Sequence, residues 1–91
     1  MTRYFISQKN NAKYFQRTIY GYRPHRAFQA TKNFAHIKKK QYIVLDGLHK
    51  NHLELYNSNK EWLGVINFDG TLNKHLTTNG SNKLHQKLKE M

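Results

Sequence analysis

Four side chains that can donate or accept protons fall within nine residues near the middle of the chain: Asp46, His49, His52 and Glu54. A carboxylate and an imidazole together supply a general base and a general acid. Lysine and arginine side chains nearby would stabilise the negative charge that develops on a reacting phosphate. Such a set fits cleavage of RNA without metal, in which a base takes the ribose 2′-hydroxyl proton and an acid protonates the departing 5′-oxygen.

At the level of sequence, two non-catalytic roles for these side chains stay open. Histidine and glutamate on a solvated strand face are usually ordinary surface residues, and only a fraction of such clusters are functional. The pair His49 and His52 could also ligate a metal ion. The chain has no cysteine and only two clustered imidazoles, however, so we expect no metal and no cofactor.

The composition indicates a single domain with a polyanionic partner. The chain has 91 residues and a formal net charge of +11, which exceeds the magnitude of roughly 2–8 that solubility alone favours in a small domain. We therefore expect RNA as the partner, although a generic basic protein is an alternative. No apolar run approaches the ~20 residues that cross a bilayer, and the first residues lack a secretory apolar segment. We expect a cytoplasmic site of action and no membrane partner.

The charge divides the domain, residues 1–91, into two parts. Residues 1–40 contain ten lysines and arginines and no acid, whereas residues 41–91 contain six lysines and five acids. Tyrosines and phenylalanines interleave with the charges of the first part, and disordered segments are poor in such residues. The sequence predicts an RNA-contacting part, 1–40, and a catalytic part, 41–91. The side chains expected to bind RNA are Arg17, Arg23, Arg26, Lys38, Lys39, Lys40 and Lys74.

The pattern of residues predicts an α+β fold. Segments 41–46, 52–56 and 62–67 are rich in β-branched, aromatic and leucine residues and end at turn-forming dipeptides or polar turns. They predict a small twisted antiparallel sheet of three or more strands within residues 41–72, with a basic N-terminal region and a short C-terminal helix. Segment 18–22 favours an extended piece, and segment 25–36 favours a short helix or a turn-rich connection. Segment 77–82 is predicted to be a loop, and segment 83–91 is predicted to form the C-terminal helix.

Alternation within segment 52–56 predicts which side chains lie together. In a strand, successive side chains point to opposite faces. His52, Glu54 and Tyr56 should therefore share one face, and Leu53 and Leu55 should share the other. The pattern brings one histidine and the only nearby glutamate onto a common surface.

The stretches Asp46-Gly47-Leu48-His49, Leu53-Glu54-Leu55-Tyr56 and Trp62-Leu63-Gly64-Val65 resemble the cytotoxic ribonuclease domain of the ribosome-inactivating colicins. That domain carries an Asp-x-x-His stretch, a Leu-Glu-x-Tyr strand and a His-Leu-Gly strand in the same order. The resemblance covers roughly residues 42–70. It implies that Glu54 is the general base, that His49 is the general acid and that Asp46 supports the histidine, with a 2′,3′-cyclic phosphate as product.

The chain departs from the pattern of this family at two points. The interval from His49 to Glu54 is one residue longer, so that a bulge is required or His52 is the working histidine. The family also uses an arginine near its C-terminus, whereas no arginine follows Arg26 in this chain. Lys83, Lys74 or an arginine from the N-terminal part could take that role.

Three functions remain open from the sequence. The first is a toxin ribonuclease, for which the resemblance implies small-subunit ribosomal RNA at the decoding centre as substrate and an acidic immunity protein or antitoxin as partner. The second is a non-catalytic basic module that binds RNA. The third is a toxin nuclease that acts on mRNA or tRNA.

Overall fold

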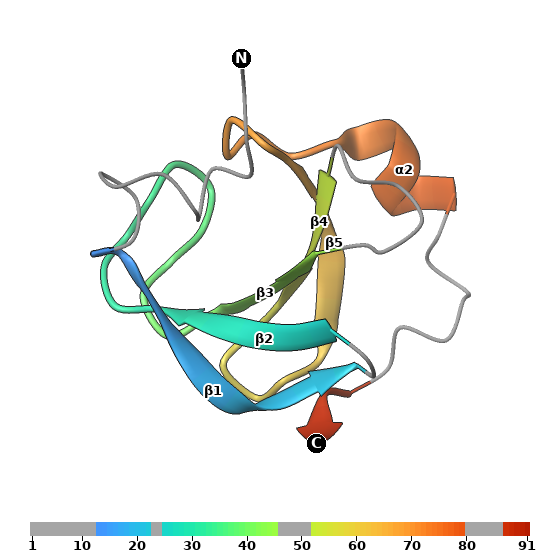
Figure 1. Ribbon diagram of the computed structural model, residues 1–91. Coiled ribbons are helices and arrows are strands. Elements are labelled where there is room, and N and C mark those ends of the chain that lie inside the picture. Colours follow the sequence, from blue (N-terminus) through green and yellow to red (C-terminus); the bar gives the residue numbers. More distant parts are fainter. Residues whose placement is uncertain (1–12, 23–24, 46–51, 80–86) are drawn as a thin grey trace.

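The computed structural model describes residues 13–22, 25–45, 52–79 and 87–91. These residues form a six-stranded antiparallel sheet that is not closed, with one short helix in the C-terminal part (Figure 1). The strands lie in the order β5-β4-β3-β2-β1-β6. The elements are β1 (Phe15–Tyr22), β2 (His25–Ala30), β3 (Tyr42–Leu45), β4 (His52–Tyr56), β5 (Trp62–Asn67), α2 (Lys74–Asn79) and β6 (Lys89–Glu90).

The predicted fold, a small antiparallel sheet with a short helix, is confirmed. The expected meander corresponds to β3, β4 and β5, and the extended piece expected at 18–22 lies within β1. The prediction of a helix or turn-rich connection over 25–36 is wrong for 25–30, which form β2. Phe28 and Ala30 pack into one core while Ala27 packs into another, so β2 is covered on both faces and lacks the half-polar alternation of an exposed strand.

The helix lies earlier in the chain than expected. The amide of Leu76 donates to the side-chain oxygen of Asn73 at 2.9 Å, which is the hydrogen bond of a helix N-cap and starts α2 at Lys74. The loop expected at 77–82 is therefore wrong for 77–79. The helix expected at 83–91 is wrong for 87–91, where Lys89 and Glu90 pair with β1. No helix in the described part of the chain is long and apolar enough to cross a membrane.

Each face of the sheet carries a buried cluster. The first core packs around Ile43 and Leu53, and the partly buried Phe34 lies against it, with its ring 5.8 Å from that of Phe15. The second core packs on the opposite face around Tyr42 and Tyr56. Members of the first core are Phe15, Ala30, Ile37, Ile43, Leu53, Leu55 and Ile66; members of the second are Ala27, Tyr42, Val44, Tyr56 and Leu88, with Tyr20 and Trp62 partly buried against it.

The outer edge of β5 is covered by the chain that follows it. The Val65 amide donates to the Thr77 hydroxyl at 2.8 Å, and the Val65 carbonyl accepts from the Asn73 amide at 2.8 Å. Gly64 lies under Thr77, where an added Cβ would come within 2.7 Å of the threonine hydroxyl. The turn and α2 thus satisfy backbone groups that an uncovered edge strand would expose.

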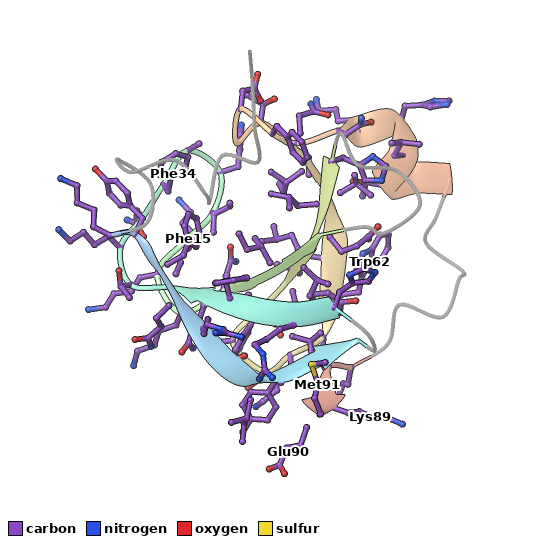
Figure 2. The ribbon with its side chains drawn as sticks, in the orientation of Figure 1. Phe15, Phe34, Trp62, Lys89, Glu90 and Met91 are labelled. Atoms are coloured by element: carbon purple, nitrogen blue, oxygen red, sulfur yellow. The ribbon has the colours of Figure 1, made fainter. Side chains whose placement is uncertain are left out.

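The last five residues connect two distant parts of the sheet. The Leu88 amide donates to the Lys60 carbonyl at 3.0 Å, just before β5, and the Met91 amide donates to the Ile19 carbonyl on β1 at 2.9 Å. Figure 2 shows the side chains of Lys89 and Glu90 pointing away from the sheet. Leu88 is buried in the second core. This segment therefore covers the second core while its charged side chains face solvent.

We expect Leu88→Ala to lower the free energy of unfolding by about 2–3 kcal/mol, because it removes a buried side chain that anchors the C-terminal segment. Leu72→Ala is the matched control, since Leu72 is exposed, and its effect should stay within about 0.5 kcal/mol. Urea unfolding followed by the fluorescence of Trp62, the only tryptophan, measures both. Equal losses in the two variants would contradict this role of Leu88.

We expect Lys40→Gly to raise the free energy of unfolding by about 0.5–1 kcal/mol. Lys40 has a φ of 76°, a left-handed conformation that costs a side-chain-bearing residue roughly 1–2 kcal/mol, and this relief outweighs the extra freedom of glycine in the unfolded chain. Lys39→Gly removes the same charge at a neighbour without positive φ and should destabilise. Thermal unfolding of both variants tests the difference, and a loss in Lys40→Gly would contradict it.

Candidate functional site

Glu54 lies on β4, the strand next to the β5 edge of the sheet, and is buried. It occupies the middle of β4, directly opposite Val44 on β3 and Val65 on β5. Only 4% of Glu54 is exposed. A carboxylate between two valines loses hydration that the protein must replace with hydrogen bonds or charges. The alternative that this glutamate belongs to a solvated face is therefore wrong.

Trp62 provides one such hydrogen bond. Its indole Nε1–H donates to Oε1 of Glu54 at 2.7 Å. Trp62 pairs with Tyr56, and a bulge between Leu55 and Tyr56 changes the register of β5 at this position. The side chains of Glu54 and Tyr56 point to the same face, so the long indole of Trp62 reaches back to the carboxylate. Figure 2 shows Trp62 on the opposite side of the molecule from Phe15 and Phe34.

His52 shares the face of Glu54, as the alternation of β4 predicted. Tyr56 on the same strand belongs to the second core, whereas Leu53 and Leu55 belong to the first. His52 pairs with Asn67 and is 6% exposed. An imidazole and a carboxylate two residues apart on one strand thus lie on the same buried face. The other predicted catalytic residues, Asp46, His49 and Lys83, lie outside the described residues.

The structure adds His25 to this face. Ala27 on β2 belongs to the second core, as do Val44 on β3 and Tyr56 on β4. His25 lies two residues before Ala27 and therefore points to the same face of the sheet, as His52 does two residues before Glu54. Each of the two histidines is the first residue of its strand. The sequence carried no signal for this, because the pairing of β2 with β3 is a long-range event.

Lys60 is a second residue that sequence reasoning missed. Its ammonium lies 4.6 Å from the ring centroid of Tyr20 and 5.9 Å from that of Tyr42, and both rings contact the second core. The two rings meet edge to face at 6.0 Å. Ammonium groups at such distances are attracted to the faces of aromatic rings. The face that bears Glu54 therefore also carries a half-buried cation.

The predicted RNA-binding side chains are spread over several parts of the structure. Arg17 is exposed and pairs with Phe28, on the face opposite Glu54. Arg26 lies on that same opposite face by alternation, and its guanidinium donates to the Thr18 carbonyl at 2.7 Å. Lys74 is exposed at the first position of α2. Lys38, Lys39 and Lys40 are exposed between β2 and β3, and Arg23 lies outside the described residues.

Asp69 accepts hydrogen bonds that account for its lowered pKa. The Thr71 hydroxyl donates to its carboxylate at 2.6 Å and the Thr71 amide donates to the same oxygen at 2.9 Å. These bonds, the hydroxyl bond foremost, lower the pKa of Asp69 below its ordinary value. Asp69 lies in the exposed turn after β5 and stabilises that turn. In the described ranges, histidine, aspartate and glutamate side chains form no group of three that could hold a metal ion.

Comparison of the chain with protein-family models, with curated proteins and with solved structures gave no match.

We expect Trp62 and Glu54 to be coupled by about 1.5–3 kcal/mol in a double-mutant cycle, because a hydrogen bond to a buried charged group contributes in that range. The cycle uses Trp62→Phe, which removes the donor, and Glu54→Leu, which removes the acceptor. Chemical unfolding is followed by far-ultraviolet circular dichroism, since the tryptophan is absent from two variants. Additive effects of the two substitutions would show that the contact contributes little.

Proposed function

We propose that this protein is a ribonuclease that cuts RNA by acid-base catalysis, with Glu54 as the general base. The observation that carries the proposal is the buried carboxylate of Glu54, held by Trp62 Nε1 at 2.7 Å. Burying an ion costs several kcal/mol, and an apolar residue between Val44 and Val65 would fill the same place in the sheet. A chain of charge +11 that retains this carboxylate is consistent with chemistry on a bound polyanion.

In the proposed reaction, Glu54 takes the proton of a ribose 2′-hydroxyl. The 2′-oxygen then attacks the adjacent phosphorus, and the bond from phosphorus to the 5′-oxygen breaks. A protonated imidazole donates its proton to that leaving oxygen, which becomes a 5′-hydroxyl. The other product is a 2′,3′-cyclic phosphate. Cationic side chains stabilise the extra negative charge on the phosphate in the transition state.

His52 and His49 are the two candidates for the general acid from the sequence, and His25 is a third. His52 and His25 lie on the face of Glu54, toward the same end of their strands. The resemblance to the colicin domains favours His49, with Asp46 as its support. Lys60, which reaches the same face, joins Lys83 and Lys74 among the cations that could replace the family arginine.

The resemblance also supplies the proposed substrate and partner. We infer a bacterial toxin that acts in the cytoplasm on small-subunit ribosomal RNA at the decoding centre. Its neutralising partner would be an acidic immunity protein or antitoxin, because an acidic surface complements a strongly basic one. A toxin nuclease for mRNA or tRNA would use the same catalytic groups.

A non-catalytic RNA-binding module is the second candidate. The hydrogen bond from Trp62 to Glu54 favours this module, because the bond joins β4 and β5 whether or not Glu54 is catalytic. In that case the charge of the chain would account for the whole function, and the histidines on the same face would be incidental.

Glu54→Gln separates the two candidates. The amide oxygen still accepts from Trp62, so we expect the fold to persist, but the amide cannot take a proton. Cleavage of purified ribosomes and of naked RNA in EDTA should fall about 10²–10⁴-fold. Glu61→Gln is the matched control, because Glu61 is exposed, and its activity should equal that of the unchanged protein.

The products and the histidine variants complete the test. A single cut in small-subunit RNA that ends in a 2′,3′-cyclic phosphate supports the ribosomal target, whereas cuts in naked RNA alone indicate the mRNA or tRNA alternative. His25→Ala, His49→Ala and His52→Ala identify the acid by which of them loses cleavage. RNA left intact by the unchanged protein, in every preparation, would refute catalysis and leave the binding module.

A further inference from the structure

The connection between β2 and β3 gathers exposed positive charge. Lys38, Lys39 and Lys40 follow one another on a turn and are exposed. Lys13 lies beside this connection because its carbonyl accepts from the Thr31 hydroxyl at 3.0 Å. Lys32 is also exposed, within the same connection. We call these five lysines the lysine turn.

Hydrogen bonds hold the backbone of the lysine turn at its three consecutive lysines. The amide of Lys38 donates to Oε1 of Gln41 at 2.9 Å, and the amide of Lys39 donates to Oδ1 of Asn33 at 2.8 Å. The amide of Lys40 donates to the Ala30 carbonyl at 2.8 Å. A backbone held in this way loses little further freedom when its lysines bind a ligand.

The hydrophobic core anchors the same connection. Ile37 is fully buried in the first core, and it exchanges two backbone hydrogen bonds with Phe34 at 2.7 and 2.8 Å. Lys40 adopts a left-handed φ of 76°. Non-glycine residues keep such conformations where the surrounding structure enforces them, and they concentrate at binding sites. The turn is therefore a fixed feature of the fold.

No acidic residue lies near the lysine turn in the sequence. Residues 13–45 contain no aspartate or glutamate. Gly70 lies against Ala35 of this connection, and the carboxylate of its neighbour Asp69 already accepts two hydrogen bonds from Thr71. Concentrated like charges repel one another unless a ligand of opposite charge is bound. The lysine turn is thus suited to a polyanion.

The neighbouring side chains favour a phosphate backbone over an acidic protein. Protein interfaces are depleted in lysine and depend on aromatic or apolar anchors. The large exposed apolar side chains in the described part of the chain are Ile19, Leu63, Leu72 and Met91, all outside residues 31–41. Lysine ammonium groups, as compact point charges, bind phosphates without such anchors.

The lysine turn is near enough to Glu54 for one RNA to reach both. Lys40 is four residues from Val44, a stretch that spans at most about 14 Å, and Val44 lies across from Glu54 by about 5 Å. Gln29, which pairs with Tyr42 on the face of Glu54, donates through Nε2 to the Lys40 carbonyl at 3.1 Å. This hydrogen bond links the turn to the face that carries the carboxylate, while Ile37 packs into the core on the opposite face.

We propose that the lysine turn binds phosphodiester groups that flank the scissile phosphate and so holds the RNA over Glu54. The proposal rests on the proposed function, because it assigns both sites to one substrate. Binding here is independent of base identity, since the ligand groups are phosphates. Lys38 and Lys39 carry the two contacts that are easiest to remove without changing the left-handed position at Lys40.

The test compares two double variants in the Glu54→Gln background, where RNA stays intact during binding. Lys38→Gln/Lys39→Gln removes two charges from the lysine turn. Lys87→Gln/Lys89→Gln removes two charges from exposed lysines of the C-terminal segment. Dissociation constants for a hairpin RNA are measured over a series of KCl concentrations. The slope of log K against log salt should shrink by roughly 1.5 in the first variant, at about 0.7–0.9 per phosphate contact, and by well under half of that in the second.

Equal changes of slope in both variants, or none in the first, would overturn the proposal, because net charge alone would then explain binding. Polyglutamate serves as a model of an acidic protein. If Lys38→Gln/Lys39→Gln loses polyglutamate binding while its RNA slope is unchanged, the lysine turn binds an acidic protein and the proposal is wrong. Circular dichroism checks that both variants are folded. Cleavage by the unchanged protein is measured separately. If cleavage is absent and the slopes are as expected, the nuclease is refuted and the phosphate site stands. If cleavage occurs and the slopes of the two variants are equal, the phosphate site is refuted and the nuclease stands.

Discussion

The hydrogen bond from the Trp62 indole to the buried Glu54 carboxylate is the contact on which the rest of this structure depends. A buried carboxylate in the middle of β4, between Val44 and Val65, needs hydrogen bonds in place of water, and these two side chains donate none. The bulge at Leu55 and Tyr56 sets the position of Trp62, so the irregular register of β5 serves the same contact. This pair therefore joins β4 and β5 and also holds the proposed general base in place.

Packing against the second core buries Glu54, while Trp62 stays partly exposed. Each face bears a buried cluster, and the second cluster includes Leu88 from the C-terminal segment, which bonds both to the chain before β5 and to β1. Without this segment the aromatic side chains around Glu54 would lose one of their covers. A chain of only 91 residues buries a modest fraction of its surface, so a five-residue terminal segment carries unusual weight in its stability.

The lysine turn and the proposed general base lie at different places in a single sheet. The lysine turn leaves the sheet at the ends of β2 and β3, whereas Glu54 lies at the middle of β4, two strands from β2. Under the two proposals, the lysine turn would hold the phosphate backbone of an RNA that is cut at Glu54.

Local patterns in the sequence determined the strands around the site, because alternation and turn residues act over a few positions. Segment 52–56 predicted both β4 and the shared face of His52 and Glu54, and it could not indicate that this face is buried. Burial of this face, and the presence of His25 and Lys60 on it, were decided by contacts between separate strands, and the Trp62 donor was placed by the bulge in the pairing of β4 with β5. The C-terminal segment illustrates the same limit: Leu84 and Leu88 have helical spacing, yet residues 89–90 form a strand because β1 offers them backbone partners. Tertiary hydrogen bonding outweighed a weak local preference there, whereas α2 begins at the local N-cap that Asn73 forms with Leu76.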